Sequence, residues 1–587
     1  MILEYITLAV YLGVLLALGA YFKKFTKNLS DFVRGGGQGS WWLIGTSILM
    51  SAISAFTFTG NASAAFEAGP SLLIIYAANC AGFAFGGLCV GPWLRQTRAY
   101  TTADVVRARF GVPVEQFGAY FGVIMGPITA SIQLYALALF ASTVLGLPLI
   151  PIMVSIALIV TFYSTTGGKW AVMATDFVQA MVMLSITILV CFLSLRAIGG
   201  FPEFLAYFQD PRFSEDFKLI KDAEAFPGDR YTLKWAIAIF LMQANAQLSL
   251  SSAGRYISAR DGKEASRASW LGFALMALGS AVWFIPPMVA RFLFESEILN
   301  SGIANPAESA YAFIAIKLLP NGMVGLLIAA MFAATMSSMD TGLNGQVGVI
   351  VRNIIPRLRS AFGKSEPLDA RVEMRICQFT TLLLGSLILG YALLFVFYSK
   401  IALFDASLMV ATVIGLPMAF PLFIGLWLRR LPKWSYFPIF IACLAPSIWS
   451  FIDDKLNGNS WTIQDRAIWI MLFGTIATLI SLLLARYSSS KSQAEVDEFF
   501  KLMHTPIDYQ KEIGEASVDH EQYFVISKAI YYVGALILLL LLVPNDSFNR
   551  LCIFCVAAFI LATATLLHLG GKRIQSRSAK EIQTEEP

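Results

Sequence analysis

The sequence predicts an all-α integral membrane protein, a bundle of about 15 transmembrane helices, and three observations lead to this fold class. Of the 587 residues, 57% are hydrophobic and only 14% are charged, and the mean hydropathy of +0.67 lies outside the balance of soluble globular domains. Apolar runs long enough to cross a hydrocarbon core alternate with short charged connectors. The net charge of +5 is too small and too scattered to indicate nucleic-acid binding.

The apolar runs place the spans along the whole chain. The first run has no basic residue ahead of its apolar stretch, so we expect a retained span there and no signal peptide. The predicted spans are 3–22, 41–66, 71–95, 115–145, 147–164, 173–197, 233–253, 269–292, 323–352, 375–397, 403–428, 435–451, 467–485, 527–543 and 550–569.

Charge sidedness gives the predicted topology. Basic connectors follow the first, third, seventh, ninth and eleventh spans, as the positive-inside rule requires for cytoplasmic loops. The acidic connector 198–232 then lies on the opposite side, with the N-terminus outside and the C-terminus in the cytoplasm. The basic residues of these connectors are Lys23, Lys24, Lys27, Arg34, Arg95, Arg98, Arg107, Arg109, Arg255, Arg260, Lys263, Arg267, Arg352, Arg357, Arg359, Arg429, Arg430 and Lys433.

The two ends of the chain lie outside the main bundle in this prediction. Residues 1–40 form an extra N-terminal helix with a cytoplasmic loop, and residues 433–485 form additional helices. Residues 486–525 are highly charged, which predicts a solvated cytoplasmic linker that can include one short interfacial helix. Residues 526–587 form a final transmembrane hairpin and a tail.

Two spans are too polar at mid-membrane to face lipid, and they lie five spans apart. Interrupted helices of this kind free backbone groups to bind ions and solutes in transporters. The alternative is that small polar residues merely let helices pack closely. The polar residues are Ser51, Ser54, Thr57, Thr59, Gly60, Asn61 and Ser63 in the second span, and Gln243, Asn245, Gln247, Ser249, Ser251 and Ser252 in the seventh.

Two further spans carry polar groups suited to a cation. On a helix, Ala334, Ser337 and Ser338 share one face, which offers two hydroxyls and a carbonyl to an alkali cation, although helix packing is the alternative. Asp176 lies just inside the sixth span after a Gly-Gly turn. It marks either an ion path or an interfacial acid paired with Lys169. Asp340 and Asn344, one turn apart, could equally form an inner-side polar network.

Four segments, in consistent order, resemble the sodium:solute symporter family. They are ISAFTFTGNASAAFEAG, RAYTTADVVRARFG, YSTTGGKWAVMATDFVQ and MSSMDTGLNGQ, and the likeness covers about residues 1–485 with gaps. The resemblance implies a leucine-transporter-like 5+5 fold, with inverted repeats at 41–230 and 231–432 and transport by alternating access. It implies sodium as the coupling ion, bound by Met50, Ile53, Ala334, Ser337 and Ser338, with Asp176 on the sodium exit path and solute or gate contacts at Thr57, Asn61, Asn79, Ser249 and Ser252.

Departures from the family pattern refine these expectations. Ala334 stands where members with a second sodium have a hydroxyl, which favours one sodium per cycle. Tyr76 stands where sugar-type members carry an acid, and GNASAAFEAG resembles carboxylate- and vitamin-type members, so such a solute is favoured over a sugar.

The expected function is a sodium-coupled symporter that imports a small organic solute across the plasma (inner) membrane. A proton-coupled carrier is one alternative, and a membrane sensor built on a transporter bundle is another. An enzyme is not expected, because no nucleophile, base or metal cluster stands out and His504, His520 and His568 all lie near the C-terminus.

Overall fold

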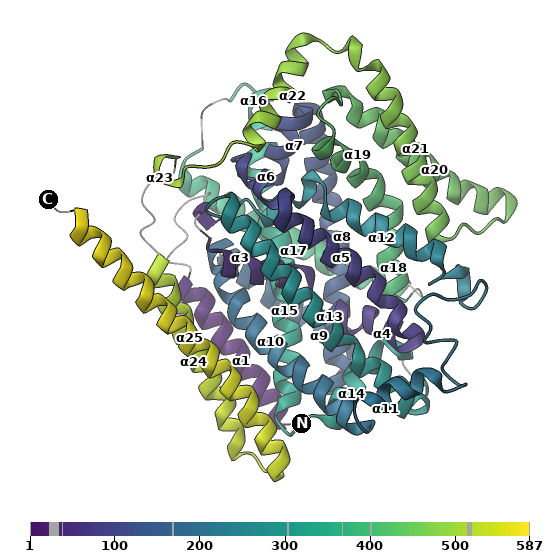
Figure 1. Ribbon diagram of the computed structural model, residues 1–587, viewed down its shortest axis with the longest axis vertical. Helices are drawn as coiled ribbons and strands as arrows, with labels where there is room; N and C mark the ends of the chain where they lie inside the picture. Colours follow the sequence, from purple (N-terminus) through teal and green to yellow (C-terminus); the bar gives the residue numbers. More distant parts are fainter. Residues whose placement is uncertain are drawn as a thin grey trace.

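The computed structural model of the chain is a bundle of long helices (Figure 1). Within the described residues, the only β-structure is an isolated bridge between Gly39 and Ala259. Eleven helices of the described chain are long and apolar enough to cross a membrane, and three shorter apolar helices accompany them. The all-α class is confirmed, whereas the count of about 15 spans is not. The structure describes residues 2–22, 35–37, 39–166, 169–301, 305–364, 366, 368–398, 402–512 and 519–585.

The first five predicted spans of the core begin with a broken helix. Helix α3 stops at Ala52, and Ile53 and Ser54 have extended backbones before the chain re-enters helix. At the restart a Cβ on Gly60 would lie 2.5 Å from the Phe56 ring, so the turn has no room for a larger residue. The helices of this part are α3 (Trp41–Ala52), η3 (Ala55–Phe58), α4 (Gly60–Ala68), η4 (Gly69–Leu72), α5 (Leu73–Phe85), the π-helical turn η5 (Gly86–Val90), α6 (Gly91–Gln96), α7 (Thr102–Phe110), α8 (Val112–Leu145), α9 (Leu149–Thr166) and α10 (Lys169–Ala197).

The second five predicted spans also begin with a broken helix. Helix α12 stops at Gln247, and Ser249 has an extended backbone before a 3₁₀ segment. Both predicted interruptions are thus present. The helices of this part, with the short ones in the connectors before it, are α11 (Phe201–Ala206), η6 (Tyr207–Gln209), η7 (Pro227–Asp229), α12 (Leu233–Gln247), η8 (Leu250–Arg255), α13 (Gly262–Leu299), η9 (Pro306–Ser309), α14 (Ala310–Leu318), α15 (Met323–Val349), η10 (Ile350–Ile354), α16 (Ile355–Ala361), α17 (Ala370–Tyr398), α18 (Leu403–Val410), η11 (Ala411–Gly415) and α19 (Leu416–Trp427).

The remaining helices pack around the two groups of five spans. Helix α1 (Ile2–Phe22) lies against α15, where Glu4 accepts a 2.8 Å hydrogen bond from the Gly322 backbone N–H at the start of α15. The hairpin of α24 and α25 lies along one edge of the bundle against α10 (Figure 1). The remaining helices are η2 (Gly35–Gly37), η12 (Lys433–Ser435), α20 (Tyr436–Asn457), α21 (Ile463–Leu483), η13 (Leu484–Tyr487), α22 (Ser490–Met503), α23 (Tyr509–Glu512), α24 (Asp519–Leu539), η14 (Leu540–Leu542) and α25 (Ser547–Glu585).

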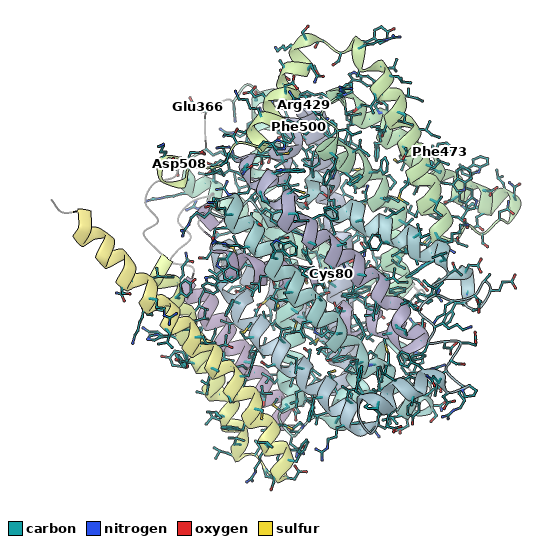
Figure 2. The ribbon with its side chains drawn as sticks, in the orientation of Figure 1. Cys80, Glu366, Arg429, Phe473, Phe500 and Asp508 are labelled. Atoms are coloured by element: carbon teal, nitrogen blue, oxygen red, sulfur yellow. The ribbon has the colours of Figure 1, made fainter. Side chains whose placement is uncertain are left out.

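The segment predicted as a solvated linker that can include one short interfacial helix contains a helix docked on the bundle. Helix α22 packs against α6 and α7, and Figure 2 shows its Phe500 beside Arg429 at the upper end of the bundle. Arg429 pairs with Asp497 of α22 at 2.7 Å. The helix docks because its apolar residues recur at helical spacing and share one face. These buried residues are Val496, Phe499, Phe500 and Met503.

The basic connectors meet at one end of the bundle, as the charge pattern predicts. Arg95 donates to the Arg260 carbonyl at 3.1 Å, Arg352 pairs with Asp104 at 3.1 Å, and Arg109 donates to the Gly425 carbonyl at 2.8 Å. We call this the basic end. The basic residues between positions 23 and 34 lie outside the described residues.

The acidic connector 198–232 packs at the other end of the bundle. Its Asp216 pairs with Arg291, in the last three turns of α13, at 3.2 Å, and its Lys221 donates to the Ala68 carbonyl at the end of α4. We call this the acidic end. Helix α1 begins there, and the C-terminal helix α25 runs away from it, so the two termini lie at opposite ends (Figure 1).

Candidate functional site

A cavity of about 390 Å³ lies between the broken helix α3–η3–α4 and the helices that face it. Its wall combines aromatic rings with hydroxyl and amide groups, and the described lining residues include no Lys, Arg, Asp or Glu. We call it the solute cavity. Its lining comprises Ala52, Ser54, Phe56, Thr57, Asn61, Ile75, Tyr76, Asn79, Phe121, Met125, Thr129, Ile132, Gln133, Gln243, Phe404, Ser407, Leu408, Val410, Ala411, Ile414, Gly415 and Met418.

Three of the predicted solute contacts line this cavity. Thr57 comes from η3 and Asn61 from α4, at the break that follows α3, and Asn79 comes from α5. Asn61 Nδ2 donates to the Tyr76 hydroxyl at 2.8 Å, and Asn79 Oδ1 accepts from Gln247 Nε2 at 2.9 Å. These bonds orient the two side-chain amides. Each bond uses one polar atom of the amide, the Asn61 nitrogen or the Asn79 oxygen, and leaves the other polar atom for a solute.

The structure does not bring the other two predicted contacts to the solute cavity. Ser249 donates to the Ala246 carbonyl at 3.2 Å, and Ser252 donates to the Ser249 carbonyl at 2.8 Å. Both are buried within the second break, where their hydroxyls bond the local backbone. That break instead places Ser251 and Arg255 on a second, larger cavity.

The five residues predicted to hold sodium come from two helices that pack together. Met50 and Ile53 lie at the broken end of α3, and Ala334, Ser337 and Ser338 lie on α15, which contacts both α3 and η3. A hydrogen bond of 2.8 Å from the Ala55 N–H to the Thr335 hydroxyl joins the break to α15. All five residues are buried.

The buried groups at this junction fit a cation. Ser337 is 1% exposed, and its hydroxyl has no hydrogen-bond partner among the described residues. Burying a hydroxyl without a partner costs free energy. The break leaves the last carbonyls of α3 without the partners that a continuing helix supplies. Among the described residues, the backbone bond that Met50 O accepts is a long one, of 3.4 Å, from the Ile53 N–H. Hard oxygens with unfilled lone pairs suit an alkali cation.

One contact joins this junction to the solute cavity. The Ser338 hydroxyl donates to Gln133 Oε1 at 2.9 Å, and Gln133 lines the solute cavity. Sequence reasoning missed Gln133, although a lone glutamine in the apolar run ITASIQLYALALF is itself a signal that the position faces protein or water. The partner on α15, 205 residues away, has no sequence signal.

The two aspartates of α10 and α15, Asp176 and Asp340, are buried in the protein. Asp176 is 0% exposed and accepts a 2.5 Å hydrogen bond from Ser47 of α3, so the predicted exit-path acid contacts the helix that carries Met50. Asp340 accepts from Ser164 of α9. Asn344, its predicted partner one turn on, is buried with no hydrogen-bond partner among the described residues. The Gly-Gly turn at 167–168 and the Lys169 side chain lie outside the described residues.

A wider cavity of about 640 Å³ opens toward the basic end. Its lining includes Ser338 of the candidate sodium site, and it shares Phe121, Gly415 and Met418 with the solute cavity. The two cavities therefore adjoin, and the hydrogen bond between Ser338 and Gln133 joins the lining of one to the lining of the other.

Comparison with known proteins gives the family. Residues 32–434, more than half of the chain, match the model of the sodium:solute symporter family. The sodium/sialic acid symporter NanT of Aliivibrio fischeri is 23% identical over 84% of this chain and 95% of its own length. The sodium/sialic acid symporter SiaT of Proteus mirabilis is 25% identical over 73% and 85%, and the pig sodium/myo-inositol cotransporter 2 is 26% identical over 61% and 57%.

A solved structure gives the fold. A sodium-coupled sialic acid symporter in a substrate-bound outward-open state superposes with a TM-score of 0.70 at 20% identity, covering 82% of this chain and 97% of that one. The leucine-transporter-like architecture is confirmed by this likeness. The protein is a multi-pass membrane transporter that couples solute movement to sodium, and its chain belongs to the sodium:solute symporter family.

Proposed function

We propose that sodium binds at the junction of α3 and α15, that the solute occupies the solute cavity, and that the two sites communicate through Ser338 and Gln133. The observation that carries the sodium site is the buried Ser337 hydroxyl without a partner. A buried hydroxyl without a partner is destabilising, and a bound cation would remove this desolvation cost. The carbonyl groups at the open end of α3 supply the other oxygens of the site. Sodium shapes the solute cavity, so each ligand raises the affinity of the other.

We infer that the solute is an uncharged, hydroxyl-rich molecule. The polar groups of the cavity are hydroxyls and amides, including Thr57, Asn61, Asn79, Gln133 and Gln243, which suit uncharged donors and acceptors. A carboxylate would lose its hydration there without a cationic side chain from the described lining. The geometry therefore favours a sugar- or polyol-like solute over the carboxylate that the sequence favours.

Uptake into proteoliposomes tests both parts of this proposal. The panel is myo-inositol, glucose, N-acetylneuraminate and iodide, each with a sodium gradient, a choline gradient and a proton gradient. We expect sodium-stimulated uptake of an uncharged polyhydroxyl solute. Sodium-stimulated uptake of N-acetylneuraminate alone would contradict the solute class, and uptake that follows protons and ignores sodium would contradict the sodium site.

A matched pair of variants ties uptake to the cavity. Asn79→Ala removes an amide of the solute cavity, and Asn300→Ala removes an exposed asparagine at the end of α13. We expect Asn79→Ala to lower uptake at least about tenfold, since a site built to hydrogen-bond its substrate loses about 1.4 kcal/mol or more per missing partner. Asn300→Ala should leave uptake unchanged.

We propose that the basic end faces the cytoplasm and that sodium leaves past Asp176. The inward membrane potential then adds about 2.3 kcal/mol per charge per 100 mV to uptake. The N-terminus lies outside and the C-terminus inside, in the plasma (inner) membrane. A reporter that fluoresces only in the cytoplasm, fused after Pro587, should be bright; a dark fusion that is active as an exported phosphatase would reverse the orientation.

A further inference from the structure

A third cavity, of about 180 Å³, lies at the acidic end next to the solute cavity. Phe404 lines both cavities, and no other described residue is common to their linings. It belongs to the first turn of α18. That turn therefore lies between the two cavities and contributes to the wall of each.

Two polar contacts hold the first turn of α18. The Leu403 N–H, one of the free donors at the start of the helix, donates to Glu308 Oε1 of η9 at 2.7 Å. Arg230, which precedes α12, pairs with Asp405 at 2.7 Å. The two contacts lie on either side of Phe404 in the sequence, so the backbone that carries this residue is held from both neighbours.

Negative charge exceeds positive charge around this turn. Three carboxylates, Glu67, Glu308 and Asp405, line the third cavity with one guanidinium, Arg230. The other charged or titratable neighbours are directed elsewhere or are uncharged: Arg291 of α13 pairs with Asp216 and Glu295, and Tyr135 of α8 is half-buried. Glu67 and Asp405 are partly open to water, whereas Glu308 is 3% exposed.

Glu308 is thus the carboxylate whose charge is hardest to accommodate. It lies in η9, between the spans α13 and α15 and outside both. Burial raises the pKa of its carboxyl from 4.5 to about 7, and the charges of Glu67 and Asp405 act in the same direction, against the Leu403 N–H. The neutral carboxyl still accepts the Leu403 N–H through its carbonyl oxygen.

We propose that Glu308 is a positioning residue for a gate formed by Phe404, and that a proton on Glu308 holds this gate shut. The inference rests on the assignment of the solute cavity, because the gate is a gate only if that cavity lies on the transport path. When α18 moves away, Glu308 faces water, releases the proton and repels Glu67 and Asp405.

The sign of the pH effect follows from linkage. Protons favour the state in which the carboxyl has the higher pKa, which is the closed gate. Acidification closes the gate, and the response falls between pH 4.5, the ordinary pKa of the carboxyl, and about pH 7, the pKa of the buried carboxyl. With these two values the ratio of open to closed protein rises by up to about 70-fold from pH 5 to pH 8.

Cysteine labelling tests the gate without sodium or solute. Ser407 lies on α18 and lines the solute cavity behind Phe404, so Ser407→Cys in the full chain freed of its native cysteines reports opening. A membrane-impermeant, cationic methanethiosulfonate is added on the η9 side, with and without E308Q. The ratio of the two labelling rates at each pH removes the titration of the thiol itself.

We expect the labelling rate of the protein with Glu308, divided by that of E308Q, to rise at least about tenfold from pH 5 to pH 8. A ratio that is constant with pH would overturn the proposal. E67Q should keep the response but move its midpoint to lower pH, because one neighbouring negative charge is lost. If E308Q does not fold, the E67Q midpoint decides: a downward shift supports the gate, and an unchanged midpoint overturns it. Loss of sodium-stimulated uptake would refute the proposed function and leave this readout intact.

Discussion

Replacing Ser337 by alanine separates a sodium ligand from a packing serine. The Ser337 hydroxyl is buried without a hydrogen-bond partner among the described residues. Removing it relieves an unsatisfied group, so the sodium-free variant should be as stable as the natural protein or up to about 1 kcal/mol more stable. A packing serine would behave in the opposite way.

The cost should appear only with sodium. A hydrogen bond or contact to a charged partner contributes about 1.5–3 kcal/mol, so losing one of five oxygens should weaken sodium binding about 10- to 150-fold. At a sodium concentration about 100 times the dissociation constant, sodium stabilises the natural protein by about 2.7 kcal/mol. A tenfold weaker site under the same conditions gives about 1.4 kcal/mol.

Thermal unfolding of the purified protein in sodium chloride and in choline chloride measures both effects. Ser194→Ala is the matched control, since Ser194 is equally buried on α10 but donates to the Val190 carbonyl at 2.7 Å. It should leave the difference between the two salts unchanged. The reasoning is refuted if Ser337→Ala destabilises the protein in choline and keeps the full sodium-dependent shift.

Three further predictions concern coupling, stability and the docked linker. Gln133→Leu should leave sodium affinity without solute within about threefold but reduce the factor, typically about 5- to 150-fold, by which solute raises it; isothermal titration of sodium with and without solute measures this, and an unchanged factor contradicts the link. Glu4→Gln should lower the free energy of unfolding by about 1 kcal/mol in both salts, because a charged acceptor at the start of α15 is lost; equal melting temperatures would contradict it. The hydrogen bond from Arg98 holds the pKa of Glu512 below its usual 4.5. The contact between the α6–α7 connector and α23 is therefore fully present above pH 4.5 and is lost as the pH falls through the lowered pKa. Hydrogen exchange of the α23 amides should increase in that acidic range in the natural protein and not in Arg98→Gln, which lacks the contact.

Much of the bundle could be predicted because lipid imposes strong patterns. Apolar runs and alternating connector charge locate the spans and the two ends, and polar residues in mid-span locate both breaks. The α22 helix was hidden by its average polarity. The buried residues Val496, Phe499, Phe500 and Met503 follow the spacing i, i+3, i+4, i+7. However, seven of the fourteen residues of the helix SKSQAEVDEFFKLM are charged or serine, so its composition alone indicated a solvated linker.

The candidate site shows where sequence reasoning stops. The Ser337 and Ser338 face follows from helical spacing, and the break in α3 follows from polarity. Contacts between helices do not follow from either. Gln133 meets Ser338 only because α8 packs on α15, and Ser249 and Ser252 turn into their own backbone because the chain after α12 is a 3₁₀ segment and not an open strand.

The three cavities give a physical account of why the two ends differ. Toward the basic end the solute cavity shares three lining residues with a wide cavity, whereas toward the acidic end it shares one described residue, Phe404, with a small one. Two contacts hold the short helix α18 at the acidic end, and in our proposal the one between Leu403 and Glu308 depends on a proton. Alternating access requires that closing one end be linked to opening the other. In our proposal sodium acts on the basic end, because Ser338 lines the wide cavity and bonds Gln133 of the solute cavity, and Glu308 acts on the acidic end. The two coupling steps then depend on two different groups, which separate variants can distinguish.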